Sequence, residues 1–171
     1  CAELEDGTLV EGELAVRGLS KSPIKHVFLR EPAPAYAPVI HAILQADLVA
    51  IGPGSFFTTV LAGLALDGVI EALRSTDGQV MFVCNTTTQP GQTDGFSVLE
   101  HVRRIVDFVG PGVIDMVLIN RSRVDAATMR SYEEDGLFLL QPDDEEIAQI
   151  AALGPRPIVR PLAEAVGQKR A

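Results

Sequence analysis

The sequence contains no tryptophan, only two cysteines and three histidines, and few aromatic residues of any kind. Two cysteines without a Cys-x-x-Cys pair exclude a disulfide framework, and the absence of Cys/His ligand spacing argues against a zinc site. No apolar run reaches the roughly 18 residues of a membrane span, and no segment reads as a signal peptide. We therefore expect a cytoplasmic protein with no membrane partner and no resident metal.

Basic residues are scarce as well, with 14 Lys and Arg against 23 Asp and Glu and a net charge of −9. A nucleic-acid-binding protein normally carries a basic patch, so we expect no nucleic-acid partner. What the chain does contain is 47% hydrophobic and 22% charged residues over 171 positions, a composition typical of a globular domain. This length fits one domain with a sizeable core.

Hydrophobic periodicity and turn signals predict an alternation of short strands and helices. Asp6-Gly7 favours a hairpin over 2–11, Ser97 with Glu100 forms a capping box, and Ile40, Ile43 and Leu44 would form the buried stripe of one helix. The predicted strands are 25–30, 47–51, 80–84, 114–119 and 137–140. The predicted helices are 38–46, 55–66, 67–74 with Asp67 as its cap, 97–109, 125–135 and 143–153; the tail 155–171 has no clear pattern.

Strands alternating with helices indicate an α/β fold with a mostly parallel sheet. We expect one α/β domain over 1–171, in which 2–30 forms a hairpin-and-strand region and 38–171 forms the βα units. Ligands of such sheets bind at the carboxyl ends of the strands, near a switch point in strand order. This rule selects three loops: 52–59, 85–95 and 120–123.

The loop 52–59, GPGSFFTT, lies between a predicted buried strand and a helix. Gly52 and Gly54 allow a ligand to approach the backbone, and the helix start offers unpaired N–H groups that suit a phosphate. Ser55, Thr58 and Thr59 add hydroxyl groups. The alternative is a tight turn in which Ser55 only caps the helix.

The loop 85–95, NTTTQPGQTDG, is polar throughout and leaves a buried strand at its carboxyl end. Its amides and hydroxyls suit the neutral edges of a base, a sugar or a flavin ring. Asp94 is its only ionisable group and is a candidate metal ligand, sugar contact or base. The alternatives are a solvated surface loop and an Asx-turn in which Asp94 bonds nearby backbone.

Other reactive residue types have weaker claims. Arg121 and Arg123 suit either an anionic ligand or surface salt bridges. His26, His41 and His101 read as partly exposed structural residues, and Cys84 reads as a core residue rather than a nucleophile because no histidine lies near it in sequence.

Three segments together resemble the gluconeogenesis-factor (YvcK-like) family within the wider CofD-like group. These are AELEDGT at 2–8, ADLVAIGPGSFFTT at 46–59 and CNTTTQPGQTDG at 84–95. The resemblance runs from residue 2 to about 120. Thr87 stands where the family commonly has Met, and Gln92 replaces the usual Glu, which weakens any proposal that needs two carboxylates in this loop.

The resemblance implies a Rossmann-like three-layer fold and binding of a nucleotide-sugar such as a UDP-sugar by a regulator of carbon metabolism, cell-wall synthesis and cell shape. The CofD branch implies instead a magnesium-dependent enzyme similar to 2-phospho-L-lactate transferase, which moves a phospholactyl group from a guanylylated donor to a deazaflavin. That branch has a different turn at 52–56, so the local sequence favours the regulator. In the enzyme reading Asp94 would be catalytic. The residues expected to hold the ligand are Gly52, Gly54, Ser55, Thr58, Thr59, Asn85, Thr88, Gln89, Gly91, Thr93 and Asp94.

The resemblance also implies a missing part. The family begins with a glycine-rich turn after its first strand, and this chain has no such turn; it begins CAEL, without Met, in what reads as a strand. We expect the chain to be the C-terminal part of a longer protein. Half of such a sheet exposes an edge strand, so we expect partner chains or the missing half to cover it. We also expect the protein to form a homo-oligomer.

Overall fold

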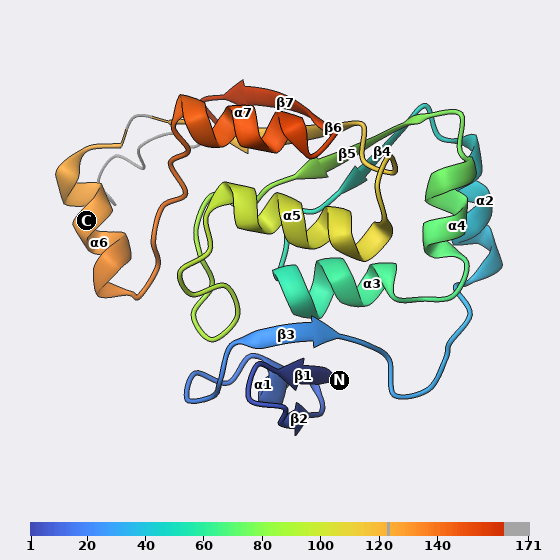
Figure 1. Cartoon of the computed structure of the whole chain (residues 1–171), viewed down its shortest axis with the longest axis horizontal. Coiled ribbons are helices and arrows are strands. Elements are labelled where there is room, and N and C mark those ends of the chain that lie inside the picture. Colours follow the sequence, from blue (N-terminus) through green and yellow to red (C-terminus); the bar gives the residue numbers. More distant parts are fainter. Residues whose placement is uncertain (123, 163–171) are drawn as a thin grey trace, which may run out of the picture.

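The computed structural model describes residues 1–122 and 124–162, which form two β-sheets packed against helices (Figure 1). The smaller sheet is antiparallel and has the order β2-β1-β3, with β1 at Ala2–Leu4, β2 at Leu9–Val10 and β3 at Ile24–Val27. The predicted hairpin is confirmed, because Ala2 lies opposite Val10. At its turn, the N–H of Thr8 donates to Asp6 Oδ1 at 2.9 Å.

The larger sheet has the order β4-β5-β6-β7, and all of its neighbouring strands are parallel. Its strands are β4 (Leu48–Ile51), β5 (Gln79–Val83), β6 (Met116–Asn120) and β7 (Arg156–Arg160). This sheet confirms the predicted α/β class with its Rossmann-like organisation.

Helices connect these strands, and α5 and α7 lie side by side over one face of the parallel sheet (Figure 1). Val80 and Phe82 of β5 and Val117 of β6 are buried on this face with Ile105 of α5. The helical segments are α1 (Glu13–Val16), α2 (Ala37–Gln45), the π-helix η1 (Phe56–Leu61), α3 (Ala62–Leu64), α4 (Val69–Ser75), α5 (Val98–Val109), α6 (Ala126–Glu134) and α7 (Asp144–Ala152).

Three of the predicted helices begin directly after a capping residue. Ser97 Oγ accepts the N–H of Glu100, Asp125 accepts the N–H of Thr128, and Asp143 accepts the N–H of Glu146. Each cap satisfies an N–H that the first helical turn leaves without an intrahelical partner.

Other local predictions are wrong, and for Asp67 a tertiary contact outweighs the local signal. Asp67 does not cap α4, whose N-cap is Gly68; its backbone pairs with 33–35 instead. Residues 137–140 do not form a strand of either sheet, since only Leu139 makes a bridge, to Thr87. Of the stripe predicted for α2, Ile40 and Ile43 are partly buried against the core, whereas Leu44 is exposed.

The helix predicted over 55–66 is a π-helix for its first six residues, followed by one short α-turn. In the tail, β7 forms a strand, and residues 163–171 lie outside the described residues. No helix among residues 1–122 and 124–162 is long and apolar enough to cross a membrane.

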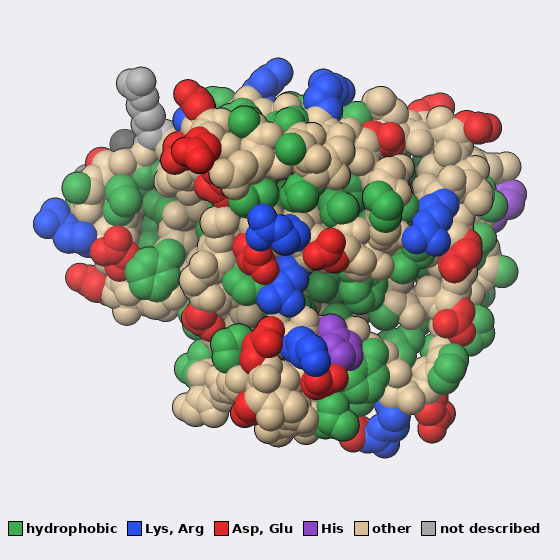
Figure 2. Space-filling view, viewed as in Figure 1, with side chains coloured by type: hydrophobic (Ala, Val, Ile, Leu, Met, Phe, Trp, Pro, Cys, Tyr) green, Lys and Arg blue, Asp and Glu red, His purple; other side chains and the backbone are tan. Residues whose placement is uncertain are grey.

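The smaller sheet is attached to α5 by Arg104. Its guanidinium donates to the carbonyl of Lys25 on β3 at 2.8 Å and lies 3.9 Å from the carboxylate of Glu5, while its Nε donates to Glu100 at 2.8 Å. Figure 2 shows basic and acidic side chains gathered at this junction between the small sheet and α5. The attachment positions the small sheet beneath the helix that follows the loop 85–95.

Candidate functional site

The carboxyl ends of β4, β5 and β6 bring the three sequence-selected loops to one edge of the parallel sheet. The first two loops contact each other directly. Asn85 Nδ2 donates to the carbonyl of Gly54 at 2.9 Å, and the N–H of Phe56 donates to Gln89 Oε1 at 2.8 Å. The polar loop therefore forms part of the structure that shapes the glycine turn.

Gln92 makes a second link between the same loops. Its Nε2 donates to Ser55 Oγ at 3.3 Å, and its Oε1 accepts from the hydroxyl of Thr58 at 3.5 Å. Gln92 is buried, so it supports the turn from the protein interior. The sequence prediction did not include this residue among the site residues.

The turn itself leaves backbone donors unused. The carbonyl of Gly54 and the N–H of Ser55 belong to the same trans peptide group and point in opposite directions. Because Asn85 binds this carbonyl, the N–H of Ser55 points away from the polar loop. Within the described ranges, the N–H groups of Ser55, Phe57 and Thr58 donate to no protein acceptor. Ser55 makes no side-chain cap, so the simple capping role is not what the structure shows.

Two glycines of the predicted site are explained by the fold alone. Gly52 has a φ of +83°, and a Cβ there would lie 3.0 Å from the carbonyl oxygen of Val83. Gly91 has a φ of +75°, and a Cβ there would lie 2.5 Å from the carbonyl oxygen of Arg17. A side chain at either position would strain the backbone or displace a neighbouring peptide.

Gly54 differs from both. Its φ lies outside the left-handed region, and a Cβ there would make ordinary contacts of 3.6–3.7 Å with Thr59 and Val60. The fold accommodates an alanine at this position. No clash therefore requires glycine at position 54, and the absence of a Cβ leaves the backbone of the turn accessible.

Asp94 bonds nearby backbone, but the contact reaches three residues back along the chain, whereas an Asx-turn reaches two residues forward. Its Oδ2 accepts the N–H of Gly91 at 2.7 Å, and the side chain is exposed. Lys21 donates to the carbonyl of Gly91, which joins the tip of the loop to the segment after α1. Burial lowers the pKa of Lys21, and the charge of Asp94 acts in the opposite direction.

The threonines of the polar loop stabilise its shape. Thr93 Oγ1 accepts the N–H of Gln89 at 2.8 Å, and Thr88 Oγ1 accepts the N–H of Phe138 at 2.9 Å. Both side chains are buried. Their hydroxyl groups therefore accept hydrogen bonds from backbone N–H groups and do not face solvent. Thr59, in the glycine turn, differs because its side chain is exposed.

One polar atom at this edge has no donor. Asn85 is 9% exposed, and its Oδ1 is buried without a hydrogen-bond partner in the described part of the chain, although its Nδ2 binds Gly54. An unpaired buried acceptor costs free energy. Asn85 therefore supplies an acceptor next to the open glycine turn.

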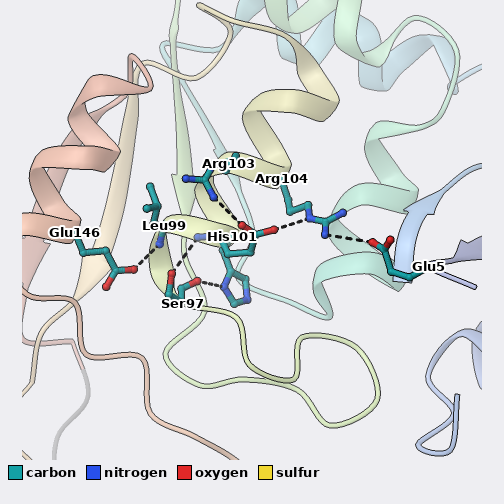
Figure 3. Close-up of polar contacts among 8 residues, drawn as sticks. Glu5, Ser97, Leu99, His101, Arg103, Arg104 and Glu146 are labelled. Atoms are coloured by element: carbon teal, nitrogen blue, oxygen red, sulfur yellow. Dashed lines mark hydrogen bonds and ion pairs between the residues drawn. The ribbon is translucent and has the colours of Figure 1, made fainter. Parts of the chain in front are cut away.

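His101 belongs to the support of the turn, and the prediction that it is partly exposed is wrong. Its ring lies edge-on to Phe56 at 5.0 Å and to Phe96 at 5.3 Å, and Nδ1 lies 2.8 Å from the carbonyl oxygen of Ser97 (Figure 3). The side chain is fully buried, and Nε2 has no partner among the described residues. Burial is the main cause that lowers the pKa of this imidazole.

The position of His101 has a sequence signal. It lies three residues after Val98 and four before Ile105, and both are buried, so helical periodicity places it on the apolar face of α5. Glu146 of α7 accepts the N–H of Leu99 at 2.7 Å and so caps the same helix from outside (Figure 3).

Cys84 is buried at the end of β5, as predicted. Burial, with a smaller effect from the charge of Glu146, raises the pKa of its thiol to about 12. A thiol with this pKa is protonated at neutral pH and is a poor nucleophile. Among residues 1–122 and 124–162, no group of three or more His, Cys, Asp and Glu side chains is placed to hold a metal ion.

The third loop is arranged differently. Arg121 forms a salt bridge with Asp144 at 2.7 Å, and Asn120 Oδ1 accepts from Ser122 Oγ at 2.6 Å and from the N–H of Leu162. Arg123, predicted together with Arg121, lies outside the described residues. Arg121 therefore forms a surface salt bridge, which is one of the two roles that the sequence analysis offers for it.

Comparison with known proteins identifies relatives of this chain. A Clostridium acetobutylicum protein provisionally named as a gluconeogenesis factor is 38% identical over 153 residues, covering 87% of this chain and 34% of the relative. A "Gluconeogenesis factor" of Halalkalibacterium halodurans is 34% identical over 134 residues, covering 78% of this chain and 41% of the relative. The chain thus spans well under half the length of these two curated relatives.

The fold has solved counterparts as well. A crystal structure of a Bacillus halodurans protein superposes with a TM-score of 0.85 at 31% identity, covering 92% of this chain and 50% of that one. The family model described as "2-phospho-L-lactate transferase CofD" matches residues 1–162. With the parallel sheet and the two joined loops at its carboxyl edge, this match shows that the chain belongs to the CofD family.

Proposed function

We propose that this chain is part of a cytoplasmic regulator of the gluconeogenesis-factor type that binds a nucleotide-sugar. The ligand's phosphates lie at the glycine turn, where Gly54, Ser55 and Thr58 meet them. Its sugar or base lies toward Asn85 and Asp94. Such a regulator acts in carbon metabolism, cell-wall synthesis and cell shape. The names of the curated relatives and the polar character of both loops support this proposal.

The observation that carries the proposal is the open backbone at Gly54 and Ser55. A glycine that the fold does not require stands beside N–H groups that have no acceptor in the described part of the chain. The start of the helical segment adds a partial positive charge, which favours an anion even in a protein of net charge −9. The nearby unpaired Oδ1 of Asn85 accepts from a hydroxyl or N–H of the same ligand.

A second candidate is transfer of a phospholactyl group from a guanylylated donor to a deazaflavin acceptor. The description of the matching family favours it. Phosphoryl-centred transfer depends on positioning and on a metal such as magnesium rather than on a protein nucleophile. In this reading Asp94 is the residue that binds the metal or transfers a proton. Its Oδ2 accepts the N–H of Gly91, and the second carboxylate oxygen, Oδ1, does not take part in that bond.

Calorimetric titration with UDP-N-acetylglucosamine, with and without magnesium, tests the proposal. Gly54→Ala should leave the fold intact and weaken binding by about tenfold or more, because a methyl group blocks hydrogen bonds to a charged group. The matched control is Gly63→Ala, since Gly63 lies in α3 with open space at its Cβ position. Normal binding by the Gly54→Ala variant would show that the phosphate does not lie at this turn.

The same titration separates the two candidates. Saturable binding of the nucleotide-sugar without turnover supports the regulator. No heat with that ligand, together with magnesium-dependent turnover of a guanylylated donor and a deazaflavin, supports the transferase. In either case Asp94→Ala should weaken binding without unfolding the protein, and an unchanged Kd would remove Asp94 from the site.

A further inference from the structure

We propose that Lys21, in the segment between α1 and β3, supplies the positive charge that binds the ligand's phosphates beside the polar loop. The inference rests on the proposed function, because it adds a charged contact for the same anionic ligand. The sequence prediction did not include Lys21, which lies far from both loops along the chain. Only the packing of the small sheet against the loop 85–95 brings it to this site.

Lys21 lies at the tip of the polar loop. Figure 1 shows the loop between β5 and α5 extending toward the segment that precedes β3, and there the ammonium of Lys21 donates to the carbonyl of Gly91. The N–H of Gly91 donates to Asp94 Oδ2 at 2.7 Å. The two polar groups of the Gly91 backbone are therefore bound by side chains of opposite charge, which fixes the position of the ammonium relative to the loop.

The loop tip is adjacent to the glycine turn. Gln92, the residue after Gly91, bonds Ser55 Oγ at 3.3 Å and the hydroxyl of Thr58 at 3.5 Å. Ser55 and Thr58 are residues that we assign to the phosphates. One peptide group and the side chain of Gln92 thus separate the carbonyl that Lys21 binds from the phosphate-binding residues. Lysine has a flexible four-carbon side chain, so its ammonium can turn toward a phosphate here while the backbone stays in place.

The ammonium of Lys21 is not neutralised by a salt bridge with any described residue. Asp94 acts on it only through electrostatic attraction at longer range. Arg121, which follows β6 at the same edge of the sheet, is already paired with Asp144 at 2.7 Å. The bond that Lys21 makes to Gly91 is to a carbonyl, which carries no net charge. Lys21 therefore has a charge to offer that Arg121 shares with a carboxylate.

The chemistry of the ammonium suits a phosphate. An ammonium has three N–H donors, and the bond to Gly91 uses one of them. Burial lowers the pKa of Lys21, so its surroundings disfavour the charged form, and an anion bound beside it offsets that effect. In a protein of net charge −9, a local cation also counters the repulsion that the whole molecule exerts on a diphosphate.

Calorimetric titration of the protein with UDP-N-acetylglucosamine at about 50 mM and about 500 mM sodium chloride tests the inference. Wild-type affinity should fall with added salt, because ions screen the attraction between the ammonium and the phosphates. Lys21→Met should weaken binding by about tenfold at low salt and should flatten the salt dependence, since a charge-assisted hydrogen bond is lost. Lys21→Arg keeps the charge and should keep the salt dependence.

Lys25→Met is the matched control. It removes the same charge from a side chain on β3 that is 52% exposed and paired with Glu3 at 2.7 Å. Its affinity and its salt dependence should stay within about twofold of the wild type, because an exposed pair away from the loop contributes little. Circular dichroism of each variant shows that the fold is kept.

The salt dependence separates a charge contact from a purely structural one. If Lys21 only holds Gly91 in place, Lys21→Met weakens binding but keeps the wild-type salt dependence, and that result would overturn the inference. Unchanged affinity in Lys21→Met would also overturn it, as would loss of the salt dependence in Lys21→Arg or in Lys25→Met. In each of these cases the wild type still binds the nucleotide-sugar, so the proposed function stands. A wild type that binds no UDP-N-acetylglucosamine contradicts the proposed function, and the inference fails with it.

Discussion

At the scale of single residues, the site depends on side chains that bond backbone. Gln89 and Asn85 bind the two ends of the Gly54–Phe56 segment, and Thr93 supports Gln89 from inside the loop. An amide can satisfy donors and acceptors together, which a carboxylate cannot. The polar residues of 85–95 thus define the turn, whatever ligand it holds.

His101 makes stability depend on pH. Its native pKa is lowered, chiefly by burial, whereas an unfolded histidine titrates near about 6.5. The unfolded state therefore binds the proton more readily, and stability should fall as pH drops below that value, by at most about 1.4 kcal/mol per pH unit from this group.

Urea unfolding at several pH values between 7.5 and 5 measures this slope. His101→Phe keeps an aromatic ring beside Phe56 and Phe96 and should flatten the pH dependence. An equal slope in the two proteins would mean that other groups cause it.

At the scale of elements, α5 receives support at its first turn from two sources. Ser97 caps it from within, and Glu146 of α7 accepts the N–H of Leu99 from outside (Figure 3). The second contact joins two helices that lie on the same face of the sheet. The start of α5 follows directly after the polar loop, so this support also positions that loop.

Ser97→Ala should lower the free energy of unfolding by about 1 kcal/mol through loss of the cap. Glu146→Gln should also destabilise the protein, because a charged acceptor is replaced by a neutral one. Glu145→Gln is the matched control, since Glu145 contacts only the exposed Gln149 among the described residues. Chemical denaturation measures all three variants, and equal stability of the two glutamine variants would show that the contact with α7 contributes nothing.

At the scale of the whole molecule, the small antiparallel sheet and the parallel sheet meet at α5 and at the polar loop. Arg104 reaches Lys25 of β3, and its guanidinium also lies 5.6 Å from the centre of the Phe96 ring. Gly91 packs against the backbone of Arg17 and Gly18 at the other end of this junction. The position of the loop is therefore set jointly by both sheets.

Arg104→Gln should loosen the small sheet, and hydrogen exchange of the β3 amides should become about tenfold faster, as expected for loss of one charge-assisted hydrogen bond. Arg103→Gln is a close control because Arg103 binds the same Glu100 and makes no described contact with the small sheet. If both variants exchange alike, the link through Arg104 does not hold the two sheets together.

The sequence by itself determined the elements whose signals are local. The Asp6-Gly7 hairpin, the cap at Ser97, the helix starts near Asp125 and Asp143, and the apolar strands β4 to β6 follow from turn chemistry and periodicity. Strand and helix alternation predicted the parallel sheet, and with it the edge at which the loops 52–59 and 85–95 meet. These features depend on residues close together in the chain.

The tertiary structure alone decided which of those residues face a ligand and which support the turn. Local pattern could not show that Gly52 and Gly91 avoid clashes with Val83 and Arg17 while Gly54 does not need to be glycine. It could not show that Gln92 lies behind Ser55, or that β4 is an edge strand with half-exposed side chains. Each of these facts depends on segments distant in sequence, whose distances are defined only when the sheets and helices pack.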